Sequence, residues 1–236
     1  MKKKIQKKIL FVFLFVVVGL LASQIPLSPI VGAKGQSFTP FEFLGPTSGM
    51  FLGSAPGAIS VFFVKLLKDI FFGVHFDAAT IIRLFPMIFA ALYFGLEKSR
   101  RSGKLILIIP FMAILLFVLH PEGRKAWFYS LYWLIPILAY FKKDRLILNA
   151  LGSTFTAHCV GSVAFLYAFN LPASVWVGLI PVVFVERFSF ALGIWATYLL
   201  LNSVLEKLVS IEKLKVLSPL VNQKYILSKK FLRFHA

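Results

Sequence analysis

Long apolar stretches alternate with short polar or basic connections along the whole chain. A helix rises about 1.5 Å per residue, so about twenty residues cross a hydrocarbon core near 30 Å thick. Four of the stretches are short by this measure, and the last two are long enough to tilt. The pattern predicts an all-α, polytopic membrane helix bundle of about eight transmembrane helices (six to eight). The predicted spans are residues 9–30, 38–54, 56–74, 78–97, 104–119, 126–141, 146–169 and 173–205.

Residues 36–74 allow two arrangements, because Gly45-Pro46 and Ala55-Pro56 interrupt them. Proline removes a backbone donor and disfavours helix in the preceding residue. A single span over 42–67 would place the basic residues near 98–101 outside. A tight turn over 53–56 between two helices keeps them inside, and we favour this second arrangement.

The basic residues give the predicted orientation. Nineteen of the 26 Lys and Arg residues lie in four segments, 2–8, 98–104, 142–145 and 207–233, while Lys34, Arg124 and Lys125 lie in other connections. Cytoplasmic loops of membrane proteins carry an excess of Lys and Arg. We therefore expect cytoplasmic N- and C-termini and a multi-pass protein in the cell membrane. The basic N-terminus before an apolar run also resembles a signal peptide, and we favour an uncleaved first helix.

Composition excludes an ordinary soluble domain, since 59% of residues are hydrophobic and the mean hydropathy is +0.85. The net charge of +17 suggests nucleic acid at first. However, the cations flank apolar spans, and no zinc-finger spacing or basic heptad region occurs. We predict a lipid bilayer as partner and no nucleic acid. The predicted domains are a transmembrane bundle over 1–205 and a basic amphipathic cytoplasmic tail over 206–236.

Four cations lie inside the apolar spans, where a charge is costly and usually faces a bundle interior or a wet cavity. They are Lys65, Lys68, Arg83 and Arg187, against the acids Asp69 and Glu186, so we expect an anionic or carboxylate-bearing ligand. Lys65 and Asp69 are four residues apart and are expected to pair. Lys68 and Arg83 lie near the outer ends of their spans. There each side chain could extend to the membrane–water interface, which would also explain why a cation is tolerated at these positions.

The last two spans carry the remaining polar candidates. Thr154, His158 and Ser162 form one stripe that either joins helices or lines a cavity. Glu186 and Arg187 are adjacent near mid-depth, and consecutive helical residues diverge by about 100°. At least one is therefore expected to reach another helix. Arg187 is the strongest ligand candidate, because a guanidinium binds carboxylate or phosphate in a bidentate manner.

The residues from Phe51 to Ala58, with Leu67-Lys68-Asp69 beyond them, resemble the substrate-binding (S) components of energy-coupling-factor transporters. In that prokaryotic family an apolar helix ends in a Gly/Pro turn, and the loop between the first two helices covers the ligand. Residues 31–40 match that loop. The resemblance implies vitamin uptake, a membrane coupling subunit and two cytoplasmic ATPases as partners. Such components usually have six spans.

The leading functional hypothesis is a membrane substrate-binding and transport protein for a small anionic solute such as a vitamin or precursor. The alternatives are a membrane scaffold for envelope or cell-shape machinery, and an intramembrane enzyme that uses His158, Glu186 and Arg187. No catalytic, nucleotide-binding or metal motif occurs, so we expect no cofactor or metal. The predicted ligand-binding residues are Lys65, Lys68, Asp69, Arg83, His158, Glu186 and Arg187.

Overall fold

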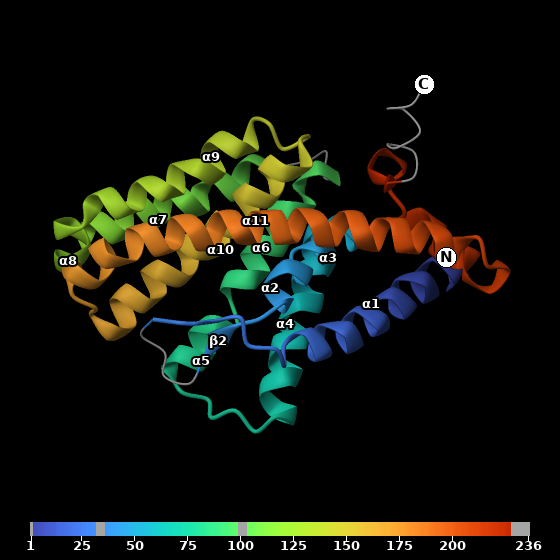
Figure 1. The fold of residues 1–236 in the computed structure, drawn as a ribbon, viewed down its shortest axis with the longest axis horizontal. Coiled ribbons are helices and arrows are strands. Elements are labelled where there is room, and N and C mark those ends of the chain that lie inside the picture. Colours follow the sequence, from blue (N-terminus) through green and yellow to red (C-terminus); the bar gives the residue numbers. More distant parts are fainter. Residues whose placement is uncertain (1, 32–35, 99–102, 228–236) are drawn as a thin grey trace.

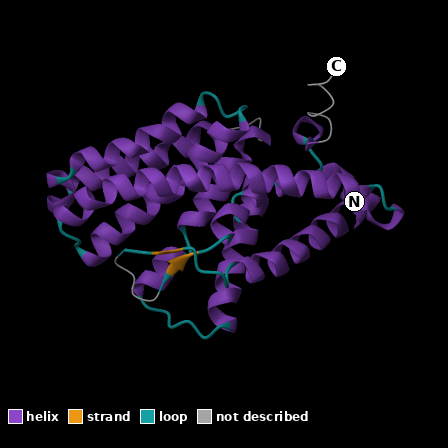
Figure 2. Ribbon diagram, viewed as in Figure 1, coloured by secondary structure: helices purple, strands orange, loops and turns teal. Residues whose placement is uncertain are grey.

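The computed structural model describes residues 2–31, 36–98 and 103–227. Over these ranges the chain is helical apart from one two-stranded hairpin (Figure 2), as the apolar pattern predicts. The α-helices are α1 (Lys2–Ala22), α2 (Phe41–Leu44), α3 (Thr47–Leu52), α4 (Ser54–Phe71), α5 (Ala78–Arg83), α6 (Pro86–Phe94), α7 (Ile108–Leu119), α8 (Pro121–Lys125), α9 (Leu134–Tyr140), α10 (Leu146–Phe169) and α11 (Ala173–Val209).

Short 3-10 helices continue or join several of these helices. They are η1 (Gly95–Lys98), η2 (Gly103–Leu107), η3 (Trp127–Trp133), η4 (Glu212–Leu220) and η5 (Gln223–Tyr225). The hairpin consists of β1 (Ser28–Pro29) and β2 (Ser37–Phe38), which pair antiparallel between α1 and α2. Figure 1 shows α11 running along the length of the molecule, with α7 and α9 on one side, α1, α4 and the hairpin on the other, and α10 crossing it.

Two of the predicted spans form unbroken helices at the predicted places. The span 146–169 coincides with α10, and the span 173–205 corresponds to α11, which continues to Val209. Among the described residues, these two helices alone are both long and apolar enough to cross a membrane. Four other apolar helical stretches are shorter, at Ile9–Ala22, Ala78–Phe94, Gly103–Leu119 and Trp127–Tyr140.

The structure corrects three other predicted spans. The first helix ends at Ala22 rather than at residue 30, since the chain then enters the hairpin. The span 38–54 is divided into α2 and α3 at Gly45-Pro46. The span 78–97 is divided into α5 and α6 before Pro86, because proline lacks the donor that would continue a helix. Proline therefore shortens helices where hydropathy alone predicts continuity.

The predicted turn after α3 is confirmed. Gly53 separates α3 from α4 with φ of 96°, a conformation that side chains with a Cβ rarely adopt. The helices then approach closely through two further glycines. A Cβ at Gly49 would lie 1.9 Å from the Ala91 carbonyl oxygen, and one at Gly57 would lie 2.5 Å from the Gly49 nitrogen. Glycine thus permits α3, α4 and α6 to pack backbone against backbone.

Asp77 is the N-cap of α5. Its carboxylate accepts a hydrogen bond from the Thr80 backbone N–H at 2.8 Å, at the start of α5. This bond stabilises the ionised carboxylate, so it lowers the pKa of Asp77 below its usual value. The cap fixes where α5 begins, and α5 carries Arg83 at its other end.

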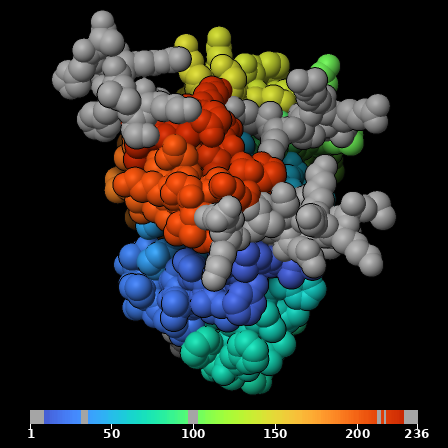
Figure 3. Space-filling view, turned by 90° about the vertical axis from the view of Figure 1, so that its right-hand side faces the viewer, coloured from blue at the N-terminus to red at the C-terminus, as the bar shows by residue number. Residues whose placement is uncertain are grey.

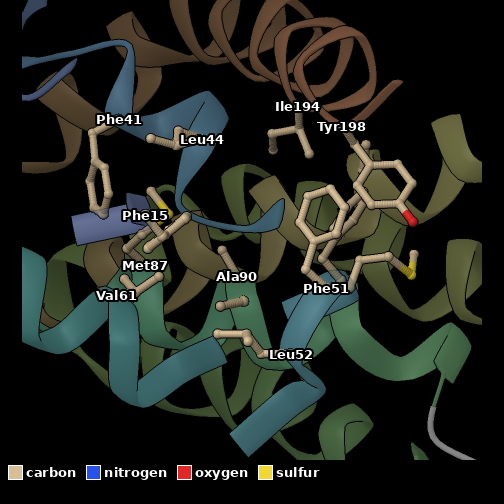
Figure 4. Close-up of a cluster of buried hydrophobic side chains, with 14 of the residues drawn as sticks. Phe15, Phe41, Leu44, Phe51, Leu52, Val61, Met87, Ala90, Ile194 and Tyr198 are labelled. Atoms are coloured by element: carbon tan, nitrogen blue, oxygen red, sulfur yellow. The ribbon is translucent and has the colours of Figure 1, made fainter. Parts of the chain in front are cut away.

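A hydrophobic cluster joins the N-terminal helices to α6 and α11 (Figure 4). Phe51 of α3 lies against Tyr198 of α11 with ring centroids 4.9 Å apart. Buried aliphatic and aromatic side chains of this kind each contribute roughly 1.5–3 kcal/mol to folding in water. The cluster includes Phe15, Phe41, Leu44, Phe51, Leu52, Val61, Met87, Ala90, Ile194 and Tyr198.

The described parts of the basic segments gather at one end of the molecule. The N-terminal end of α1 lies beside the end of α11 in Figure 1, and Figure 3 shows α11 and the tail against α1 from that side. Lys224 and Tyr225 of the tail both donate hydrogen bonds to the Asp144 carbonyl oxygen. Hence the tail also contacts the basic connection 142–145. Lys34, Arg100, Arg101 and residues 228–236 lie outside the described residues.

The tail folds back on α11 instead of extending away from it. The Asn202 side chain donates to the Asn222 carbonyl at 2.8 Å and accepts from the Asn222 N–H at 2.7 Å. Leu217, Leu220 and Ile226 are buried. The apolar side chains of the described tail therefore pack on the protein, and contact of its basic face with lipid stays a prediction.

We predict that Gly49→Ala destabilises the protein, because the new methyl group overlaps the Ala91 carbonyl. Overpacking of this kind costs about 1–3 kcal/mol of unfolding free energy. Thermal unfolding in mild detergent measures the effect. The matched control is Gly178→Ala on the exposed face of α11, where nothing lies within 4 Å. The close-packing explanation is wrong if the two variants unfold at the same temperature.

Candidate functional site

A first cavity lies among the hairpin, α10 and α11, with one wall formed by α2, α4, α5 and α6. Its volume is about 150 Å³, comparable to an engineered cavity that holds one benzene ring. Five of the seven predicted ligand-binding residues line it: Lys65, Arg83, His158, Glu186 and Arg187. These residues come from four helices, so the fold brings together groups that are up to 122 positions apart in the sequence.

A second cavity of about 340 Å³ lies beside the first and contains the other two predicted residues, Lys68 and Asp69. Glu42, Lys65 and Arg83 line both cavities and therefore form the partition between them. The second cavity is also lined by hydroxyl and amide side chains, among them Gln24, Gln36 and Thr80. Lys68 and Asp69 contact each other at 3.2 Å.

Arg187 is the most buried cation of the first cavity, with only 5% of its surface exposed. Its guanidinium lies over the rings of both Phe38 and Phe190, 4.7 and 4.6 Å from their centroids. Cation–π contacts of this kind stabilise a desolvated guanidinium. Its Nη2 bonds to Glu186, while its Nε has no hydrogen-bond partner within the described ranges. A buried donor without a partner is costly, so Arg187 retains a donor that a ligand could satisfy.

Glu186 and Arg187 correct the expectation drawn from helical geometry. We expected that adjacent residues could not mainly pair with each other, whereas Glu186 Oε2 accepts a bond from Arg187. The long guanidinium side chain folds back far enough to reach its neighbour. Glu186 does reach across the bundle, to the Ser28 hydroxyl of β1 at 3.2 Å, and not to His158, Lys65 or Asp69. The carboxylate thus links α11 to the hairpin.

Lys65 does not pair with Asp69 as the spacing predicts. Its ammonium contacts Glu42 of α2 at 3.5 Å, and Asp69 pairs with Lys68. Glu42 and Asp69 are about equally buried, at 7% and 8% exposed, so burial does not decide between the two carboxylates. Sequence reasoning missed Glu42, although it lies inside the predicted span 38–54. A complete count of acids within the spans would have found it.

Arg83 binds the hairpin through its guanidinium group. One guanidinium nitrogen donates to the Gln36 side-chain carbonyl, and the other donates to the Ser37 backbone carbonyl at 2.9 Å. Gln36 in turn donates to the Thr80 hydroxyl at 3.1 Å. Together with the Ser28–Glu186 bond, these contacts attach the hairpin to both α5 and α11. The hairpin is therefore one wall of the first cavity.

His158 is fully engaged in hydrogen bonds. Its Nδ1 receives the indole N–H of Trp133 at 3.1 Å, and its Nε2 lies 2.8 Å from the Tyr129 hydroxyl. Ser162, from the same stripe, lies 3.3 Å from Nε2 and also lines the cavity. Thr154 is buried elsewhere, so only part of the predicted stripe faces the cavity.

The cavity is charged near one end of its α11 wall and apolar near the other. Trp176 and Arg187 are eleven residues apart, about 16 Å along the helix axis. Around Trp176 the lining is apolar and aromatic, with Phe165, Leu171, Leu179 and Val183. Tyr129 stands between the two regions, with its ring 5.2 Å from that of Trp176. Sequence reasoning missed Tyr129 and Trp176, since aromatic residues are common throughout the chain and none is set apart by spacing.

The observed acids reduce the charge excess that the sequence suggests. Three cations line the first cavity (Lys65, Arg83 and Arg187) against the two carboxylates Glu42 and Glu186. The formal excess is one positive charge. A single carboxylate or another monoanion would balance it. Over the parts of the chain that the structure describes, no cluster of three His, Cys, Asp or Glu residues could hold a metal ion.

Comparisons with protein-family models, with curated proteins and with solved structures give no match for this chain. The functional argument therefore rests on the cavity and on the distribution of charge.

We predict that Glu42→Gln destabilises the protein, because it leaves the Lys65 ammonium without its carboxylate. Breaking a buried pair costs up to about 3–5 kcal/mol of unfolding free energy. The double variant Glu42→Gln/Lys65→Met removes both charges and should regain most of the loss. Thermal unfolding of both variants in detergent measures this difference. A double variant no more stable than the single one would show that the pair is not the relevant interaction.

Proposed function

We propose that the chain is an integral membrane substrate-binding protein that takes up a small anionic solute. The observation that carries the proposal is Arg187, a buried cation that lines the first cavity and whose Nε has no hydrogen-bond partner among the described residues. Lys65 and Arg83 line the same cavity and leave an excess of one positive charge. An anion would balance this charge and accept the free hydrogen bond, since a guanidinium has its donors arranged to bind a carboxylate.

A bilayer environment accounts for the outer surface. Large apolar side chains are exposed along several helices, and contiguous patches of this kind mark membrane or protein contacts. With the described parts of the basic segments at one end, the positive-inside rule favours cytoplasmic termini in a prokaryotic cell membrane. The proposed bundle has about eight crossing segments, some of them short or broken. The exposed side chains include Phe111, Leu115, Leu119, Leu138, Phe184, Val185, Leu192 and Leu200.

Within this class, the S components of energy-coupling-factor transporters are our preferred family. Support comes from the Gly53 turn between α3 and α4, and from the segment between α1 and α2, whose hairpin lines the first cavity. The partners would then be a membrane coupling subunit and cytoplasmic ATPases. The solute would be a vitamin or a vitamin precursor.

Two features favour binding over the alternative functions. An enzyme that used His158 directly on a substrate would need a ring nitrogen that the substrate can reach, whereas Trp133 and Tyr129 bond to both nitrogens. A scaffold would need only polar groups that satisfy one another, and Arg187 Nε is left without a partner in the described structure. Neither the hydrogen bonds of His158 nor the unpaired Nε of Arg187 requires a cofactor.

The predicted topology states which connections lie outside the cell. Cysteine labelling in intact bacterial cells measures this. In a Cys159→Ser background, Lys125→Cys should react with an impermeant thiol reagent from outside. Lys142→Cys should react only after the cells are permeabilised, since it lies in a predicted cytoplasmic connection. Both lysines are exposed, so accessibility within the protein does not differ. Equal labelling of both sites in intact cells would contradict the orientation.

We predict that the protein purified in mild detergent carries a small anion, which mass spectrometry identifies after denaturation. Arg187→Gln should lose that molecule while remaining folded in the membrane, because the charge and the free Nε are both removed. The control is Arg124→Gln, which removes an exposed cation that lines neither cavity. Retention of the anion by Arg187→Gln would contradict the role of Arg187.

A further inference from the structure

The hydrogen bonds around His158 determine which atom of the cavity wall is a donor. Trp133 can only donate through its indole N–H, so His158 Nδ1 must accept that bond. A neutral imidazole then carries its proton on Nε2. The nearest partner of Nε2 is the Tyr129 hydroxyl at 2.8 Å, which must accept. Trp133 therefore donates to His158, and His158 donates to the Tyr129 hydroxyl.

The Tyr129 hydroxyl proton is left to point elsewhere. The other polar atom near this oxygen is the Ser162 hydroxyl at 3.5 Å, which is a long contact for two hydroxyls. Tyr129 itself is 1% exposed and lines the first cavity. A buried hydroxyl proton gains from a partner, and the cavity is where such a partner can be placed.

The side chains around the Tyr129 ring restrict the kind of molecule that could carry this hydrogen-bond partner. The Tyr129 ring lies 5.2 Å from the Trp176 ring, and apolar side chains such as Phe165 and Leu179 complete this region. A flat apolar ring fits between such walls, and the cavity volume matches a single six-membered ring. Arg187 lines the same cavity as Tyr129 and His158. One small ligand can therefore reach both groups.

We infer that the ligand is a monoanion carrying a planar ring with a neutral hydrogen-bond acceptor, held by Arg187 at its charge and by the Tyr129 hydroxyl at the acceptor. His158 is a positioning residue, since it orients the Tyr129 hydroxyl by donating to it. This inference rests on the proposed function and adds the chemical class of the solute.

Three carboxylates test the inference by calorimetry on protein freed of bound small molecules at neutral pH. Pyridine-3-carboxylate and pyridine-4-carboxylate carry a ring acceptor, and benzoate is the matched ring without it. At least one pyridine compound should bind roughly 3- to 10-fold more tightly than benzoate, as one net hydrogen bond allows. Tyr129→Phe should abolish this preference while retaining benzoate binding.

Two further variants separate a hydrogen-bond role from a folding defect. Tyr132→Phe is the matched control, because its hydroxyl donates to the Ile180 carbonyl and does not line the first cavity. It should keep the preference. His158→Gln can both accept from Trp133 and donate to Tyr129, so it should also keep it. His158→Leu should lose it, provided that benzoate binding shows the protein is folded.

The outcomes also separate this inference from the proposed function. If benzoate and the pyridine carboxylates bind equally to the wild type, the acceptor inference is wrong, while the anion-binding function stands if Arg187→Gln abolishes that binding. If Tyr129→Phe keeps the preference, the donor is another group and the inference is wrong. If none of the three carboxylates binds to the wild type, this inference is overturned, whereas the proposed function is decided by the copurified anion and its loss in Arg187→Gln.

Discussion

The arrangement of this protein depends on how one cation, Arg187, is kept inside an apolar helix bundle. A charge removed from water is tolerated only with compensating partners. Here the partners are the neighbouring Glu186 carboxylate and the rings of Phe38 and Phe190. Phe38 belongs to the hairpin, and Glu186 also binds Ser28 of the hairpin. The same interactions that stabilise Arg187 therefore place the hairpin over the cavity.

The hairpin joins two parts of the fold that α11 alone would not connect. Arg83 attaches it to α5, and Glu186 attaches it to α11. The charged residues thus have a structural role and a cavity-lining role at once. This dual role explains why three buried cations can persist with only two carboxylates beside them. The described residues leave one positive charge of the cavity without a carboxylate and the Nε of Arg187 without a hydrogen-bond partner.

Much of the architecture could be predicted from the sequence, because apolar periodicity and length determine a buried helix such as α10. The ends of the helices in the proline-interrupted segments could not be predicted from hydropathy. These helices end where a backbone donor is missing and not where hydropathy falls. Five of the predicted site residues line one cavity, because a charged side chain within an apolar span usually faces a bundle interior or a wet cavity. Their pairings were wrong for Lys65 and Glu186, as pairing depends on tertiary neighbours such as Glu42 and Ser28. Tyr129 and Trp176 carried no sequence signal of their own.

The central claim is that Arg187 holds an anion in the first cavity. The most direct measurement is an experimental structure of the protein with its copurified small molecule bound. The account predicts an anionic group within hydrogen-bond distance of Arg187 Nε, between the hairpin and α11. A bound molecule located away from Arg187, with Nε still unpaired, would contradict it.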